Sequence, residues 1–238
     1  MVADGVGGVP AGDLASAAVV HRIAAGRLRV RDEAELLGVL RVANGDLAAH
    51  GRRDPALSGM ATTLTGLVVA ADGRILLAHS GDSRAYRLRA GELTRQTRDD
   101  SLVQMLVEQG VIAEPEALTH PRRNVVTASL SGRADDGITV RPADADWGDR
   151  WLLCSDGVTD CLPETELLSV LMPGTPAEAA DAVAELALAG GSRDNVTAVV
   201  CDVSPGEVGS REEPVFHGAA ADRFAEELGN GRALDTGR

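Results

Sequence analysis

The order in which the hydrophobic pattern changes its period constrains this fold more than any other feature of the chain. Apolar residues recur at helical spacing over residues 10–23 and 32–50, and four strand-like runs follow at 61–70, 74–80, 83–88 and 92–96. Turn signals at Asp72-Gly73 and Gly91 separate these runs, so we predict an antiparallel meander. The remaining elements are expected to be helices at 101–109, 114–119, 164–171 and 176–189, and strands at 138–141, 150–154 and 195–203.

Helices, strands, helices and strands in this order indicate an α+β fold. We expect a four-layer αββα sandwich, in which two antiparallel sheets pack face to face and helices flank them. This domain should cover residues 1–203, with a polar loop at 51–58 and a last strand whose nearly continuous apolar sequence predicts burial on both faces. From residue 204 the chain becomes polar, so 204–238 is expected to be a disordered tail with one short helix near 219–228.

Composition argues against several classes of function. The net charge is -13, whereas nucleic acids require a basic surface, so we predict no nucleic-acid partner. No apolar run is long enough to cross a membrane and no signal peptide is present, which predicts a cytoplasmic protein with no membrane segment. The three cysteines lack metal-ligand spacing, which is typical of a reducing compartment. We expect the protein to be a monomer.

Four aspartates lie where a strand-like run meets a loop. They occur in Asp4-Gly5, Gly81-Asp82-Ser83-Arg84, Ser155-Asp156-Gly157 and Asp194-Asn195. Buried carboxylates need a partner, and the chain has no Lys and few Arg near these positions. Divalent cations would neutralise several of them together, and oxygen-only ligands favour Mg²⁺ or Mn²⁺ over Zn²⁺. The alternative is that each Asp-Gly pair is only a turn, as we expect for Asp72-Gly73 and Asp136-Gly137.

Six motifs in order give the chain a specific resemblance over residues 1–203. They are Val2-Ala3-Asp4-Gly5-Val6-Gly7-Gly8, Gly59-Met60-Ala61-Thr62-Thr63-Leu64, Gly81-Asp82-Ser83-Arg84-Ala85-Tyr86, His120-Pro121-Arg122-Arg123-Asn124-Val125, Leu153-Cys154-Ser155-Asp156-Gly157-Val158-Thr159-Asp160 and Gly191-Ser192-Arg193-Asp194-Asn195-Val196-Thr197. With these motifs the chain resembles the metal-dependent Ser/Thr protein phosphatases of type 2C, in their bacterial form.

The resemblance implies a set of ligands for two Mn²⁺ or Mg²⁺ ions. Asp4 would bridge both ions, the Gly5 carbonyl would bind one of them, and Asp156 and Asp194 would hold the second. A third, weaker ion would lie at Asp99 and Asp160. Asp82 and Arg84 are interpreted as structural residues near the site that pair with each other on a tight turn.

The implied reaction is hydrolysis of phosphoserine and phosphothreonine in proteins by water activated at the dinuclear centre. None of the three cysteines starts a Cys-x5-Arg motif, which agrees with a mechanism without a covalent intermediate. Phosphorylated proteins, including a bacterial Ser/Thr kinase, would be the partners.

The chain also departs from the family pattern. The family's strand before Asp4, with a phosphate-binding Arg and an Asn-Glu-Asp segment, is missing, so we expect the first strand to be absent through a late start or a truncated gene. Val6 and Val9 stand where family members carry His, so the general acid is unassigned; His79 and His120 are expected to be structural. These departures leave open a catalytically weak or inactive relative that binds phosphoproteins as a regulator.

Overall fold

The structure is a computed structural model that describes residues 1–7, 11–25, 29–206 and 214–222. Its helices are α1 (Gly12–Ala25), α2 (Glu33–Arg53), the 3₁₀ turn η1 (Pro55–Leu57), α3 (Leu102–Glu108), α4 (Glu114–Ala117), α5 (Asp156–Thr159), α6 (Glu164–Leu171) and α7 (Pro176–Ala189). Its strands are β1 (Leu64–Val69), β2 (Ile75–Ser80), β3 (Arg84–Arg89), β4 (Glu92–Arg95), β5 (Thr139–Pro142), β6 (Arg150–Cys154) and β7 (Ala198–Asp202).

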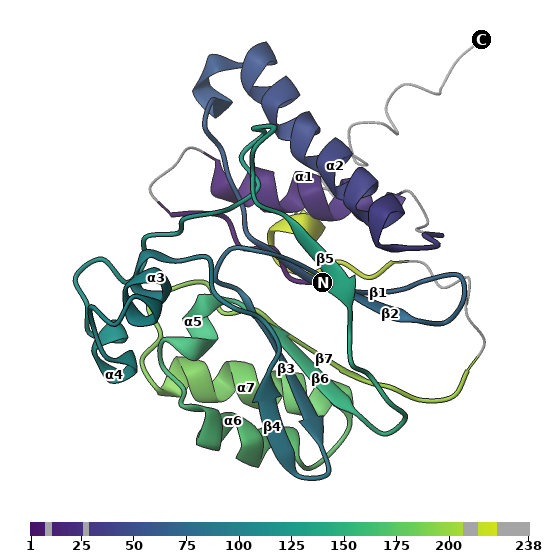
Figure 1. Cartoon of the computed structure of the whole chain (residues 1–238), viewed down its shortest axis with the longest axis vertical. Coiled ribbons are helices and arrows are strands. Elements are labelled where there is room, and N and C mark those ends of the chain that lie inside the picture. The colour runs from purple at the N-terminus through teal and green to yellow at the C-terminus, as the bar shows by residue number, and fades with distance from the viewer. Residues whose placement is uncertain (8–10, 26–28, 207–213, 223–238) are drawn as a thin grey trace.

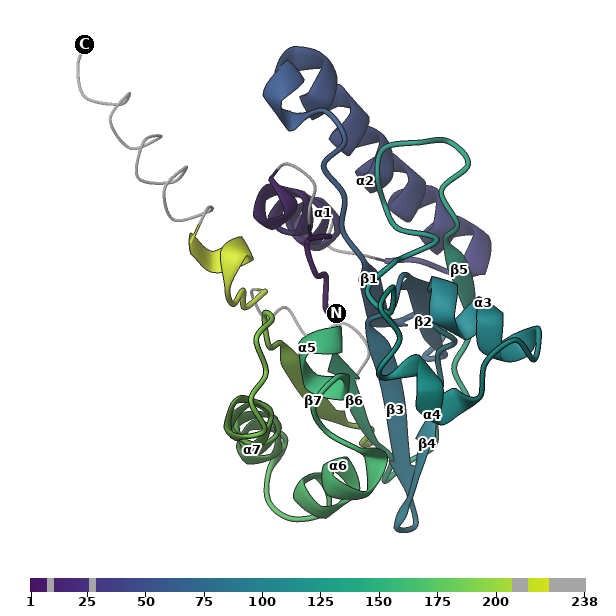
Figure 2. The ribbon, with the colours of Figure 1, turned by 90° about the vertical axis from the view of Figure 1, so that its left-hand side faces the viewer.

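The strands form two antiparallel sheets, with the orders β1-β2-β5 and β4-β3-β6-β7. Helices α1 and α2 lie on one side of the strands, and α6 and α7 lie on the other (Figures 1 and 2). This arrangement confirms the predicted α+β sandwich of two sheets flanked by helices.

Three apolar clusters hold the layers together because each sheet has two faces to bury. The first cluster joins α1 and α2 to the β1-β2-β5 sheet through residues such as Ile23, Leu40 and Leu76. The second joins α5–α7 to the other sheet around Tyr86, and the third fills the space between the sheets around Trp151. These clusters also include Met1, Val2 and Ala3, so the start of the chain packs against the core of the two sheets.

The predicted single meander is divided between the two sheets. Strand β1 pairs with β2 and β3 pairs with β4, but β2 and β3 belong to different sheets. The turn between β2 and β3 begins at Gly81, whose φ of +110° is a conformation that favours glycine. This turn carries the chain from one sheet to the other and places Asp82 between them in sequence.

Two further local predictions differ from the structure. Strand β7 is partly accessible rather than buried on both faces, because it ends its sheet within the described residues and has β6 as its only strand neighbour there. The polar segment 51–58 is not a plain loop: α2 continues to Arg53, and Asp54 caps η1 by accepting a hydrogen bond from the Ala56 N–H.

Part of the tail lies against α1. His21 Nε2 donates a hydrogen bond to the Ala220 carbonyl oxygen at 2.6 Å, and the ring centroids of His21 and Phe216 are 4.1 Å apart. Residues 219–222 are helical, as predicted, but 214–222 pack on the domain, because Phe216 and Ala220 give this otherwise polar segment apolar contacts. The rest of the expected helix, with Phe224, lies outside the described residues, and the domain boundary after 203 stays a prediction. None of the helices in the described ranges has the length and hydropathy needed to span a bilayer.

Candidate metal centre

Asp4 is fixed through its main chain by the segment that leads into β1. The Asp4 carbonyl oxygen accepts hydrogen bonds from the Thr63 N–H at 2.8 Å and from the Thr62 hydroxyl at 2.9 Å. The Asp4 N–H donates to Thr63 Oγ1 at 3.1 Å. Both threonines are buried, so water does not compete for these bonds. These bonds hold the Asp4 backbone in place and so limit the positions that its carboxylate can reach.

Gly5 is placed so that its carbonyl is available to a ligand. Gly5 and Thr62 face each other in an antiparallel bridge, but the hydrogen bonds run between their neighbours, for example from the Val6 N–H to the Ala61 carbonyl at 3.0 Å. In such a pair the polar groups of the facing residues point away from each other. A Cβ at Gly5 would lie 2.3 Å from the carbonyl carbon of Gly12 at the start of α1, so the helix packs directly on this backbone.

Asp156 and Asp194 belong to two loops that hydrogen bonds and close packing hold together. Asp156 is the first residue of α5, directly after β6 and Ser155. Ser155 Oγ donates to the Asn195 carbonyl oxygen at 2.9 Å. A Cβ at Gly157 would lie 2.5 Å from that same oxygen, so only glycine permits this approach. The loop that carries Asp194 is thereby anchored beside Asp156.

The four predicted acids interact electrostatically. Burial is the largest cause of the raised pKa of Asp4, and the Asp156 carboxylate, a hydrogen bond to it, and the charges of Asp194 and Asp82 act in the same direction. Together they raise the pKa of Asp4 to about 8. Burial and then Asp194 raise the pKa of Asp156, and burial and then Asp156 raise that of Asp82 to about 7. Groups of like charge crowded at a buried site favour protonation or a bound cation.

The donor set suits a divalent cation. Asp156 Oδ1 is buried without a hydrogen-bond partner, which is costly unless something else satisfies it. The available ligands are carboxylate and carbonyl oxygens, the type that Mg²⁺ and Mn²⁺ prefer. Within the described part of the chain no three Asp, Glu, His or Cys side chains already form a metal cage, so the ions would have to draw these carboxylates together.

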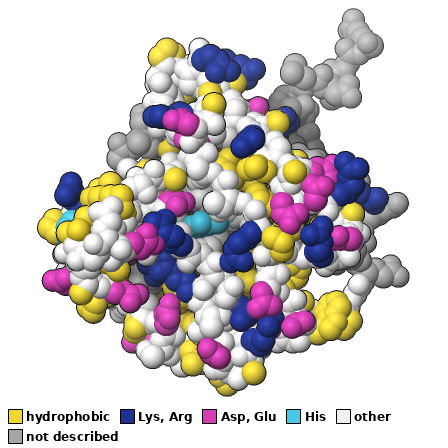
Figure 3. Space-filling model, in the orientation of Figure 1, with side chains coloured by type: hydrophobic (Ala, Val, Ile, Leu, Met, Phe, Trp, Pro, Cys, Tyr) yellow, Lys and Arg dark blue, Asp and Glu magenta, His cyan; other side chains and the backbone are white. Residues whose placement is uncertain are grey.

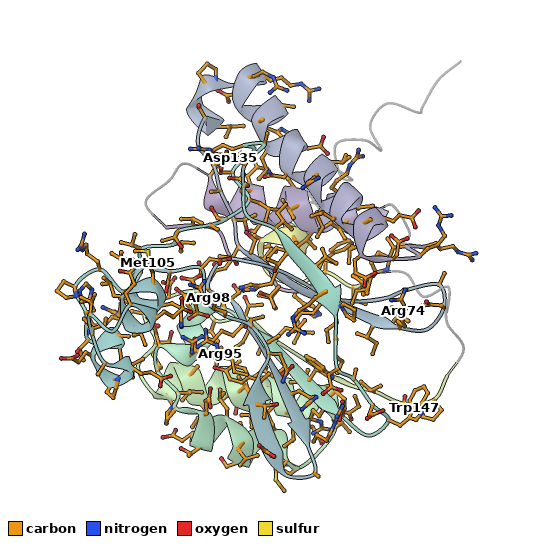
Figure 4. All side chains as sticks on the ribbon, viewed as in Figure 1. Arg74, Arg95, Arg98, Met105, Asp135 and Trp147 are labelled. Atoms are coloured by element: carbon orange, nitrogen blue, oxygen red, sulfur yellow. The ribbon has the colours of Figure 1, made fainter. Side chains whose placement is uncertain are left out.

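The interpretation of Asp82 and Arg84 as a local pair is wrong. Arg84 pairs with Asp99 instead: its Nη2 lies 2.7 Å from Asp99 Oδ2 and its Nε lies 3.1 Å from both carboxylate oxygens. Arg95, labelled in Figure 4, also forms an ion pair with Asp99. The planar guanidinium can engage both oxygens of the buried Asp99 carboxylate at once, whereas Asp82 faces other acids.

The two residues expected to bind a third ion each lie beside arginine. The Asp99 side chain is only 7% exposed and both its oxygens are engaged by the arginine pairs. Asp160 Oδ2 lies 3.5 Å from Arg123 Nε. The charges of Asp156, Asp194 and Asp82 thus act on Asp4. Asp99 and Asp160 act on Asp82 and Asp156 in turn, but each also pairs with arginine side chains of the protein itself.

Both histidines that are expected to be structural form hydrogen bonds within the protein. His79 is buried, its Nε2 donates to the Arg98 carbonyl oxygen at 2.9 Å, and burial lowers its pKa. His120 Nδ1 accepts a hydrogen bond from the Arg122 N–H at 3.1 Å. Both arrangements agree with a structural role, and the general acid stays unassigned.

Sequence reasoning gave no role to the hydroxyl groups that connect the acidic loops. These are the side chains of Thr62, Thr63, Ser83 and Ser155, all buried. In the sequence these four residues are recognisable as small polar residues directly beside strand-like runs, in the same motifs as the acids. Such residues are common in turns, so the pattern alone does not distinguish them.

The fold is an αββα sandwich with a group of carboxylates at one end of its strands. The family model described as protein phosphatase 2C matches residues 1–188. The chain belongs to the protein phosphatase 2C family.

Named relatives and solved structures agree with this assignment. The serine/threonine protein phosphatase PstP of Mycobacterium tuberculosis is 41% identical over 228 residues, which cover 92% of this chain and 43% of the relative. The chain therefore spans less than half the length of that relative. The serine/threonine phosphatase stp of Listeria monocytogenes is 34% identical over 85% of this chain and 83% of its own length.

A crystal structure of the Mycobacterium tuberculosis phosphatase PstP superposes with a TM-score of 0.76 at 42% identity, covering 85% of this chain and 87% of that one. A second structure, of the PstP catalytic domain in complex with two manganese ions, has a TM-score of 0.75 at 42% identity and covers 85% of this chain and 86% of that one.

Proposed function

We propose that this chain is a protein Ser/Thr phosphatase that hydrolyses phosphoserine and phosphothreonine with the help of two Mn²⁺ or Mg²⁺ ions. The observation that carries the proposal is the group formed by the buried Asp82, the half-buried Asp4 and Asp156 and the exposed Asp194, in which burial and then the neighbouring carboxylates raise the pKa of Asp4 to about 8. Membership of the protein phosphatase 2C family supports it, as does a relative's structure that contains two manganese ions.

In this proposal Asp4, the Gly5 carbonyl, Asp156 and Asp194 hold the two ions. When bound, such ions supply a water nucleophile active near neutral pH and neutralise charge on the phosphoryl group. Burial raises the pKa of both Asp4 and Asp156, so binding of the cations would displace protons from these carboxyl groups. Ser155 and the threonines before β1 keep the two loops oriented while this happens.

A covalent thiol route through Cys154 or Cys201 is disfavoured by the burial of these two side chains. Burial raises the pKa of Cys154 to about 12 and also raises that of Cys201. A thiol of this kind is not a useful nucleophile at neutral pH. A direct displacement by water at the carboxylate site is the reaction that the residues favour.

The proposal is tested by turnover of the purified chain on an aryl phosphate and on a phosphothreonine peptide during manganese titration. We expect turnover that depends on Mn²⁺ and that Asp156→Ala reduces by at least about 100-fold. Asp135→Ala is the matched control, since Asp135 is exposed and pairs with Arg133 on the surface. Turnover that is independent of metal, or equal in the Asp156→Ala variant, would contradict the proposal.

A second candidate is a weak or inactive relative that binds phosphoproteins as a regulator. The observation in its favour is that the two acids expected to bind a third ion form ion pairs instead: Asp99 with Arg84 and Arg95, and Asp160 with Arg123. Binding of a phosphothreonine peptide to the manganese-loaded chain, measured by fluorescence polarisation in the absence of turnover, would support this candidate over the first.

The proposed setting is a monomer in the bacterial cytoplasm that acts on phosphorylated proteins, including a Ser/Thr kinase. The three cysteines are free thiols, which suits a reducing compartment. The face in Figure 3 carries interleaved acidic and basic side chains rather than the basic stripe that a nucleic-acid partner needs. Light scattering on the purified chain and dephosphorylation of a purified bacterial Ser/Thr kinase would test the monomer and the kinase partner.

A further inference from the structure

Two consecutive threonines hold the main chain of Asp4 through three hydrogen bonds. Its carbonyl oxygen accepts from the Thr62 hydroxyl and the Thr63 N–H, and its own N–H donates to Thr63 Oγ1 at 3.1 Å. Thr62 is fully buried and Thr63 is 3% exposed, so no solvent replaces a bond that is lost. Both polar groups of the Asp4 backbone are therefore satisfied by one short segment.

The hydroxyl of Thr63 also reaches the loop that carries Asp82. Thr63 Oγ1 lies 2.6 Å from Ser83 Oγ, in a fully buried hydrogen bond. A Cβ at Gly81 would lie 2.7 Å from Thr63 Cβ, so the backbone of that turn packs against the threonine without a side chain between them. Thr63 thus connects the segment of Asp4 to the loop of Asp82 by hydrogen bonds and by close packing.

Proton counting shows why a hydroxyl is needed at this position. The Thr63 oxygen accepts the Asp4 N–H and can still share a proton with Ser83 Oγ, because a hydroxyl has one donor and two acceptor sites. Valine has the same shape and can do neither. Replacing Thr63 by valine would leave the Asp4 N–H buried and unpaired.

The charges around Asp4 explain why its backbone has to be held in place. The carboxylates of Asp156, Asp194 and Asp82 all act on Asp4 in the direction that disfavours its charged form. A charged Asp4 side chain in a flexible segment would move away from the other three. A fixed backbone keeps it in place when a cation must be bound.

We infer that Thr63 is a positioning residue for metal binding by Asp4, acting through the Asp4 N–H and through Ser83. The inference rests on the proposed function, since it assigns a role in loading the same centre. Partners that orient a ligand in this way contribute about 10–100-fold to metal affinity. The expected effect of Thr63→Val is a loss of manganese affinity in this range.

The test is isothermal titration of Mn²⁺ into EDTA-stripped full chain, with circular dichroism at the same temperature to establish that each variant is folded. Thr63→Val is expected to bind Mn²⁺ about 10–100-fold more weakly, and Thr63→Ser, which keeps the hydroxyl, should restore most of the affinity. Thr97→Val is the matched control, because Thr97 Oγ1 also accepts a backbone N–H at 3.1 Å, from Ala85 rather than from Asp4. This control should bind Mn²⁺ like the unmodified chain.

If Thr63→Val does not fold, Ser83→Ala carries the test, because it removes only the far partner of the Thr63 hydroxyl. We expect a smaller loss, about three- to tenfold, from one weakened hydrogen bond. Manganese affinity equal to that of the unmodified chain in Ser83→Ala and in every folded Thr63 variant would overturn the inference. If the unmodified chain bound no Mn²⁺, the proposed function would fail instead, so the two failures are distinguishable.

Discussion

Replacing Asp4 by asparagine is expected to stabilise the metal-free protein at alkaline pH and to abolish its stabilisation by manganese. Burial and the neighbouring carboxylates raise the pKa of Asp4 from its ordinary value of 3.8 to about 8. A carboxyl whose pKa is higher in the folded state binds its proton more tightly there than in the unfolded chain. The free energy of unfolding therefore falls as the pH rises from about 4 to about 8, and asparagine removes this dependence because it cannot ionise.

The size of the effect follows from the width of that pH window. Each pH unit within it costs up to ~1.4 kcal/mol, so the change from pH 5 to pH 8 has an upper limit of about 4 kcal/mol. Asp4 is only partly enclosed and its neighbours can share protons with it, which lowers the expected loss to about 2 kcal/mol. Asp4→Asn should recover about that amount at pH 8 and little at pH 5.

The assay is urea unfolding of EDTA-stripped protein at pH 5, 6.5 and 8, repeated with manganese. At a hundredfold excess over its Kd, a ligand that binds only the folded state adds about 2.7 kcal/mol, which we expect for the unmodified chain and not for Asp4→Asn. Asp135→Asn serves as the control and should leave the pH profile unchanged, since Asp135 is exposed. An Asp4→Asn profile parallel to that of the unmodified chain would refute the reasoning.

Two other substitutions test the geometry of the centre. Gly5→Ala would place a Cβ 2.3 Å from Gly12, so urea unfolding should show a loss of about 2–3 kcal/mol. Gly7→Ala should unfold like the unmodified chain, because among the described residues nothing lies within 4 Å of the added Cβ. Asp194→Asn should lower manganese affinity in calorimetry more than Asp82→Asn does, because Asp194 is the first carboxylate to act on Asp156; equal losses would undo the ligand assignment.

Local signals in the sequence predicted local structure well. The capping box of Thr175 and Glu178, with Pro176 in the first turn, places α7 at Pro176–Ala189, and the glycine pair at 190–191 ends it. The acids at strand ends were also identifiable, because a carboxylate directly beside an apolar run needs a partner wherever the chain goes. In the structure the charges of Asp156 and Asp194 act on Asp4, and that of Asp194 acts on Asp156, while their role as metal ligands stays a prediction.

What the sequence did not predict depends on contacts between distant segments. Whether β3 pairs with β2 or β6 is decided by the turn at Gly81 and by the packing of both sheets, and neither is visible in the alternation of one strand. The partner of Arg84 is similar: Asp82 is closer in sequence, but the folded chain presents Asp99. The contact of Phe216 with His21 joins the tail to α1 and has no local signal at all.

Replacing Asp4 and replacing Thr63 are expected to differ in their effect on the stability of the metal-free protein, although both should weaken its affinity for manganese. Crowding four carboxylates into a partly buried site lowers the stability of the metal-free protein, which is a cost that functional sites commonly impose. The repulsion would relax if the Asp4 segment moved, so something must oppose that movement, and the buried hydroxyls of Thr62 and Thr63 are the groups in contact with it. Neutralising Asp4 should therefore raise stability while weakening metal binding, whereas removing the Thr63 hydroxyl should lower metal affinity with no gain in stability. If Thr63 only filled space, its replacement by valine, which has the same shape, would change neither stability nor metal affinity.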